Sequence, residues 1–277
     1  MTTPDLLFPL AALVLAIATA FAFERIARRR GVFPWLLERD AWRRWAARLV
    51  LVGALGILYS SLAGLGPEAA QPDLTELHGI ELFLLHFLLL ASLAAWYLVA
   101  FGGFDRATFA RQLGLKRREW PIWQEIALGV GGGVAIWAGV IGIMIAIGAV
   151  LFFTLGPEAM PTEPPAMIPF MAALPLALRI ALALSAGVVE ELFFRGFLQP
   201  RMGILLSTAV FAVAHASYGE PLQLVAVTLL SLAYGLLVRW RRSIWAAVVA
   251  HFVFDLIQLV LTIPAVLDQF PEMQGLP

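Results

Sequence analysis

The 277-residue chain contains no cysteine, which excludes disulfides, a thiol nucleophile and thiolate-ligated metals. Charged residues are also scarce: Asp, Glu, Lys and Arg make up 14% of the chain, whereas a soluble domain carries about 25%. The remaining composition is strongly apolar, with 61% hydrophobic residues and a mean hydropathy of +0.86. Together these values exclude an ordinary soluble domain and predict an all-α, polytopic membrane protein.

Apolar stretches of about 20 residues, the length that crosses a bilayer as a helix, recur along the whole chain. They predict eight transmembrane helices, near residues 5–23, 47–65, 80–102, 124–154, 176–198, 203–218, 222–238 and 244–267. The proline-rich segment 156–169 separates them into two parts. We therefore expect an N-terminal half (1–165) without a diagnostic motif and a C-terminal core (166–277). Glycines at 129–133 predict a close helix contact for the fourth span.

Basic residues lie almost entirely on one side of this predicted topology. Of the 19 Lys and Arg residues, all except Arg179 and Arg195 fall in connections that alternating helices place on the same side. The positive-inside rule makes that side cytoplasmic and places both termini outside. We therefore expect the protein to lie in the cytoplasmic membrane of a bacterium.

Acidic residues are nearly absent from the interior of the predicted spans. Of the 19 Asp and Glu residues, only Glu190, Glu191 and Asp255 lie well inside one. An ionised side chain at a helix centre costs roughly 2.5–3.5 kcal/mol even on insertion scales. These three acids are therefore the first candidates for function, although a structural ion network or a proton path would also place acids there.

Several polar pairs have the spacing that puts two side chains on one helix face. Glu191 and Arg195 are four residues apart, as are His251 and Asp255. At 1.5 Å per residue, Glu190, His215 and His251 lie roughly 12, 18 and 10 Å below the cytoplasmic ends of their spans. Three helices thus deliver a carboxylate and two imidazoles to a similar depth, which indicates one shared site. His86, in the third span, is expected to be a satisfied histidine of the helix bundle.

Two chemistries fit a carboxylate beside two imidazoles. A buried carboxylate with a neighbouring imidazole can activate water for attack on an amide, and Glu190, His215 and His251 are equally a set of zinc ligands. Other intramembrane protease signatures are missing, because the chain has no His-Glu-x-x-His, Gly-x-Gly-Asp or Gly-x-Ser-Gly. The cofactor prediction is therefore either none or zinc.

Three short motifs resemble, in order and spacing, those of the CPBP family of intramembrane endopeptidases, the CAAX proteases and bacteriocin-processing enzymes also called the Abi family. They are Glu190-Glu-x-x-x-Arg195-Gly196, Phe211-x-x-x-His215 and His251-x-x-x-Asp255. The resemblance covers about residues 170–265. It implies a protease of glutamate or metallo type that cleaves a membrane-associated protein or peptide near its C-terminus, reached from the cytoplasmic side.

The resemblance also implies a role for each motif residue. Glu190 would activate water with assistance from His215, while His251 and Asp255 would stabilise the oxyanion. An ionised Asp only accepts hydrogen bonds, so Asp255 would orient His251 or be protonated. Glu191 and Arg195 would form a supporting pair, and Phe211 would pack beside the site.

The expected partners are the substrate and the lipid bilayer, with no nucleic acid. Two other classes stay open at this point: a transporter or proton-relay protein, and a non-catalytic bacteriocin-immunity or scaffold protein with the same fold.

Overall fold

The chain is helical throughout the part that the computed structural model describes, and no β-strand occurs in that part. The described residues are 3–65, 81–103, 105–115, 120–159, 167–218 and 221–268. The all-α class predicted from composition is confirmed. The predicted boundary between the two parts of the chain, at residues 165 and 166, lies outside the described residues.

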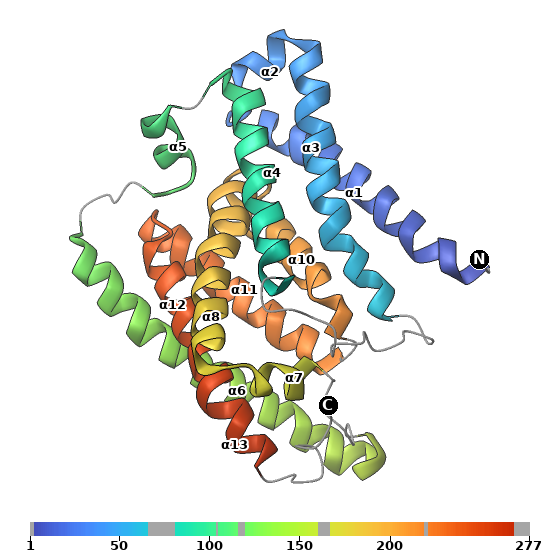
Figure 1. Cartoon of the computed structure of the whole chain (residues 1–277), viewed down its shortest axis with the longest axis vertical. Helices are drawn as coiled ribbons and strands as arrows, with labels where there is room; N and C mark the ends of the chain where they lie inside the picture. Colours follow the sequence, from blue (N-terminus) through green and yellow to red (C-terminus); the bar gives the residue numbers. More distant parts are fainter. Residues whose placement is uncertain are drawn as a thin grey trace.

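The helices differ widely in length. The long ones are α1 (Thr3–Arg29), α3 (Ala41–Tyr59), α4 (Leu84–Phe101), α6 (Ile122–Leu155), α8 (Leu176–Glu190), α10 (Ile204–Ala214), α11 (Pro221–Arg241) and α12 (Trp245–Ile257). The short ones are α2 (Trp35–Arg39), α5 (Arg106–Gln112), α7 (Met167–Ala173), α9 (Gln199–Met202) and α13 (Ile263–Leu267). In Figure 1, α3, α4 and α8 run along the long axis of the molecule, whereas α1 and α6 cross it diagonally.

Six helical segments are long and apolar enough to cross a membrane. They are Leu7–Arg29, Ala41–Ala63, Glu81–Phe101, Ile122–Leu155, Leu222–Arg241 and Trp245–Leu267. The expected spans at 176–198 and 203–218 are not among them, so the count of eight is not confirmed for the described residues. The segment 176–198 has too many charged side chains for a simple apolar span: it contains Arg179, Glu190, Glu191 and Arg195. The second shortens to the 11 residues of α10, which reach about 16 Å of a roughly 30 Å hydrocarbon core.

The segment that carries the first motif is a continuous helix whose hydrogen bonding changes after Glu190. α8 ends at that residue, a π-helix (Glu191–Leu198) follows, and α9 continues directly from it. A second π-helix (Gln258–Thr262) directly follows α12, which carries His251 and Asp255. Short π-helical segments are rare and are often found at functional sites. The two helices that carry Glu190, Glu191 and Asp255 therefore depart from α geometry at or within a few residues of these acids.

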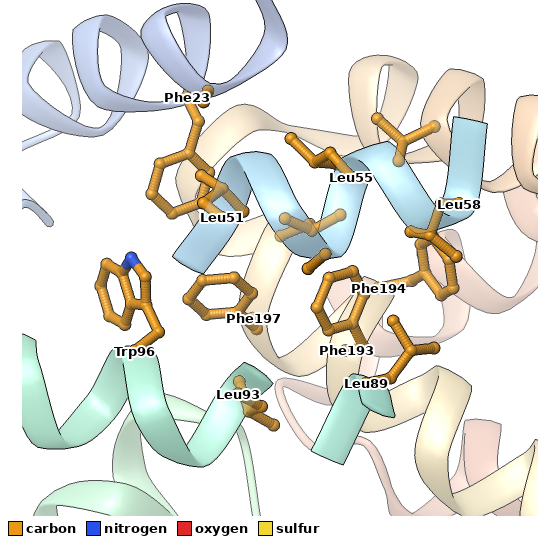
Figure 2. Packing of buried hydrophobic residues seen from close by; sticks show 14 of the residues in the cluster. Phe23, Leu51, Leu55, Leu58, Leu89, Leu93, Trp96, Phe193, Phe194 and Phe197 are labelled. Carbon is orange, nitrogen blue, oxygen red and sulfur yellow. The ribbon is translucent and has the colours of Figure 1, made fainter. Parts of the chain in front are cut away.

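The N-terminal helices bury one face of the first π-helix. Its Phe197 ring lies 4.8 Å from Trp96 of α4 and 5.3 Å from Phe23 of α1, measured between ring centroids. Figure 2 shows these rings together with Phe193, with leucines of α3 above them and of α4 below. The helices without a motif thus fix the position of the segment that carries Glu191 and Arg195, and one hydrophobic core joins the two parts of the chain.

Glycines allow α12 to approach two other helices closely. A Cβ atom added at Gly133 of α6 would lie 2.7 Å from the carbonyl oxygen of Ala250, and one at Gly187 of α8 would lie 2.9 Å from that of Val248. Real Cβ atoms essentially never show such distances. The close contact predicted for the fourth span is confirmed, and its partner is the helix that carries His251.

We expect Gly133→Ala to destabilise the protein by about 1–3 kcal/mol, the usual range for overpacking a tight contact. The matched control is Gly131→Ala, because a Cβ at Gly131 meets nothing within 4 Å and alanine favours a helix by up to about 1 kcal/mol. Thermal unfolding in detergent measures both. Equal midpoints for Gly133→Ala and the unchanged protein would contradict this account of the contact.

Candidate active site

Glu190, the last residue of α8, places its carboxylate among three histidines. Its Oε1 lies 3.6 Å from Nε2 of His86, and its Oε2 lies 4.0 Å from Nε2 of His251. His215 is close enough to interact with it electrostatically. Oε2 is buried and has no hydrogen-bond partner among the described residues. This carboxylate therefore retains an oxygen that can accept a proton from a bound molecule.

Glu191, the next residue, shares His251 with Glu190 but is also paired with an arginine. Its Oε1 lies 3.3 Å from Nη1 of Arg195 and 3.0 Å from Nδ1 of His251. Glu191 is fully buried and Arg195 is 1% exposed. The ion pair expected from their spacing is therefore present. The guanidinium also lies 4.5 Å from the centroid of the Phe211 ring, in a cation–π geometry.

His251 connects the two glutamates. Because a carboxylate only accepts hydrogen bonds, the Nδ1 of His251 donates to Glu191, an assignment that follows from the network. Its Nε2 lies 3.4 Å from Oδ2 of Asp255, one turn further along α12. The ring stacks on Tyr234, with centroids 4.9 Å apart and planes at 22°. Contacts on both edges and one face thus fix its orientation.

His215 is the C-terminal cap of α10, and its ring stacks on Phe211. The centroids of the two rings are 4.5 Å apart. The Nδ1 of His215 lies 2.8 Å from the carbonyl oxygen of Phe211 and donates to it, so Nε2 is the acceptor nitrogen of a neutral ring. Phe211 also contacts Phe194 edge to face at 4.8 Å. Its position matches the packing role expected for it.

His86 is the site residue that sequence reasoning missed. It is buried in α4, outside all three motifs, and its Nδ1 lies 2.8 Å from Oγ of Ser185 on α8. The expectation of a satisfied bundle histidine is correct for Nδ1, but Nε2 faces Glu190. Depth counted from the expected span ends puts His86 roughly 24 Å below the cytoplasmic surface, against roughly 12 Å for Glu190. These unequal depths would exclude a contact between His86 and Glu190. Figure 1 shows why the contact nevertheless forms: the first turns of α4 lie level with the middle of α8.

Two further acids are buried, but arginines neutralise them. Glu24 pairs with Arg28 at 3.0 Å and with Arg48 at 2.6 Å. Glu125, 1% exposed at the start of α6, pairs with Arg241 at 2.9 Å. Burial alone therefore does not distinguish Glu190. What distinguishes it is that its recorded ion pairs are with histidines rather than with an arginine.

The zinc set considered from sequence does not have the geometry of a metal site. No group of three His, Asp or Glu side chains in the described part of the chain is arranged to hold a metal ion. Both ring nitrogens of His251 already face carboxylates, Glu191 on one side and Asp255 on the other. The residues present therefore do not fit a zinc ion held by Glu190, His215 and His251.

Comparison with known proteins places the motifs in a recognised family. Residues 172–257 match the family model described as type II CAAX prenyl endopeptidase Rce1-like. The matched segment is similar to this family and covers less than half of the chain. It contains all three motifs that resemble the CPBP family, and that resemblance is confirmed. His86 lies outside the matched segment.

A segment of the chain is similar in sequence to a curated protein. An uncharacterized protein, YpbD of Bacillus subtilis (strain 168), is 34% identical over 77 residues, which are 27% of this chain and 41% of YpbD. The chain thus spans about two fifths of the length of this relative. Among solved structures, none gives a significant match.

Proposed function

We propose that the protein is a membrane endopeptidase in which Glu190 activates the water that hydrolyses a peptide bond. The observation that carries the proposal is the Oε2 atom of Glu190, which is buried, has no hydrogen-bond partner among the described residues and lies 4.0 Å from His251. A water between these groups would be within reach of both, as general base catalysis requires. The match to an endopeptidase family supports the same reaction.

The reaction proceeds by proton transfer through Glu190. Its carboxylate accepts a proton from water, and the oxygen of that water forms a bond with the peptide carbonyl carbon. The protonated Glu190 then gives the proton to the amide nitrogen as the C–N bond breaks, which releases a carboxylic acid and an amine. His86, whose Nε2 faces Glu190, holds the carboxylate in place, and the acceptor Nε2 of His215 assists by taking a hydrogen bond from the water.

His251 is proposed to stabilise the negative oxygen of the intermediate. Since its Nδ1 donates to Glu191, its Nε2 donates to the substrate only when the ring is protonated. Three carboxylates and one guanidinium surround it, so a proton on His251 brings the cluster closer to neutrality. Asp255, as an acceptor, orients Nε2, which is the first of the two roles considered from sequence.

The proposed substrate is a membrane-associated protein or peptide, cleaved near its C-terminus. The proposed orientation follows the positive-inside rule, with both termini outside and the site reached from the cytoplasmic side. The two spans that are not confirmed, at 176–198 and 203–218, follow each other in the chain. Whether both cross the membrane or neither does, each of the other six helices keeps the same orientation across it.

Hydrolysis of lipid-anchored peptides by the full chain in liposomes tests this function, with products identified by mass spectrometry. We expect cleavage that a strong chelator leaves unchanged, because the residues of the site do not fit a zinc ion. Loss of activity on chelation, restored by zinc, would favour the metal-dependent version instead. Absence of cleavage across a broad peptide set would favour a non-catalytic immunity or scaffold protein.

A further inference from the structure

A large basic cavity lies where the first π-helix, α9, the start of α10 and the end of α11 meet. Its volume is about 1110 Å³. Arginines from four parts of the chain line it, together with Leu205 and Leu206, and none of the described residues in its lining is Asp or Glu. The arginines are Arg30, Arg111, Arg195, Arg239 and Arg242. A concave surface with this charge attracts anions.

Of the five arginines that line the cavity, Arg195 is paired with Glu191, but three others have no acidic partner among the described residues. Arg30, Arg239 and Arg242 form no ion pair with any residue of the described part of the chain. Arg28 and Arg241, close by in sequence, are paired with Glu24 and Glu125. Positive charge without an acidic partner among the described residues therefore lines the cavity.

Arg242 adds an independent observation. It directly follows α11 with a φ of 54°, and it is the one residue other than glycine with a positive φ among those described. Glycine is the usual residue at this position after a helix. Residues in such conformations persist where the surrounding structure holds them, and they are enriched at binding sites; here the side chain lines the cavity.

One wall of the cavity is apolar and open. Leu205 and Leu206, in the first turn of α10, are 77% and 43% exposed. Leucines exposed beside several arginines form a surface with an apolar part and a cationic part. A small inorganic anion would use only the cationic part.

We propose that this cavity binds an anionic phospholipid, with the phosphate among Arg30, Arg239 and Arg242 and the acyl chains along Leu205 and Leu206. Basic pockets between membrane helices bind such headgroups on the cytoplasmic side, the side that the charge distribution assigns to these arginines. The inference concerns binding alone and does not depend on the proposed protease activity.

Lipid binding to the purified full chain tests the proposal, by native mass spectrometry and by thermal unfolding in detergent. The probes are phosphatidylglycerol, phosphatidylcholine with the same acyl chains, and glycerol 3-phosphate. We expect phosphatidylglycerol to bind and to raise the unfolding midpoint, and Arg239→Gln with Arg242→Gln to weaken its binding at least about tenfold. The matched control replaces Arg39 and Arg106, which are exposed and lie outside the cavity, and should bind as the unchanged protein does.

A second variant keeps the test decisive if the double variant is unstable. Arg242→Gly removes the charge and also relieves the positive φ, so it should raise the midpoint without lipid and reduce the response to phosphatidylglycerol. Equal binding of both phospholipids, or full lipid binding by both cavity variants, would overturn the proposal. So would a midpoint shift from glycerol 3-phosphate as large as that from phosphatidylglycerol.

Discussion

Glu190→Gln is expected to lower the rate of peptide hydrolysis by roughly 10²–10⁴-fold, the usual contribution of a general base. Glutamine keeps the size of the side chain but its amide does not accept the proton of an attacking water. Glu190 has no arginine partner, since its recorded ion pairs are with His86 and His251. The substitution therefore leaves no buried guanidinium without a counter-charge, and the fold should persist. Initial cleavage rates in liposomes measure the effect.

The control for Glu190→Gln is its thermal midpoint in detergent, which should stay close to that of the unchanged protein. A variant that cleaves at the original rate while folded would contradict the role of Glu190. An inactive variant with a strongly lowered midpoint would assign the residue to structure rather than to the reaction.

Glu191→Gln is expected to reduce stability by about 3–5 kcal/mol, the cost of removing one partner from a buried ion pair. The reason is Arg195, which is 1% exposed and loses the carboxylate 3.3 Å from its Nη1. The Nδ1 of His251 is then left with a neutral amide oxygen instead of a carboxylate, and a hydrogen bond to a neutral acceptor is weaker. Denaturation in detergent, followed by circular dichroism, measures the change.

A surface ion pair provides the matched control for Glu191→Gln. Glu38 pairs with Arg28 at 3.3 Å, with side chains 49% and 33% exposed. Such pairs contribute about 0–1 kcal/mol, so Glu38→Gln should change stability by no more than that. If Glu191→Gln is as mild as Glu38→Gln, the ion pair of the first motif does not support the fold.

The pairs within single helices could be predicted from sequence, because residue spacing determines which side chains share a face. Glu191 contacts Arg195, and His251 contacts Asp255, as the four-residue spacing indicates. Depth counting also correctly placed His251 beside Glu190. These predictions require only the geometry of a single helix, or of two neighbouring helices whose residues lie at the same depth.

Features that depend on how helices are shifted relative to one another could not be predicted in this way. His86 reaches Glu190 because α4 begins beside the middle of α8, and no residue pattern reports that offset. Buried acids at helix ends were missed for a related reason. Glu125 lies at the start of the predicted span 124–154 and was therefore not counted among the acids inside a span, but it is buried and pairs with Arg241 at the end of α11.

The number of membrane spans depends on the site itself. The charges that make residues 176–198 part of the candidate site also prevent that segment from qualifying as a simple apolar span. Hydropathy alone therefore neither assigns a membrane span to this segment nor excludes one. The helix itself is continuous and changes from α to π geometry within the segment. The six other spans have few charges, and for them prediction and structure agree.

The most direct test of the central claim is peptide cleavage in water enriched in oxygen-18, with the unchanged protein and Glu190→Gln compared in liposomes. The account predicts one heavy oxygen in the new carboxyl group of each product molecule, and product formation reduced at least about 100-fold in the variant. Product released by folded Glu190→Gln at the original rate, or product without the heavy oxygen, would contradict it.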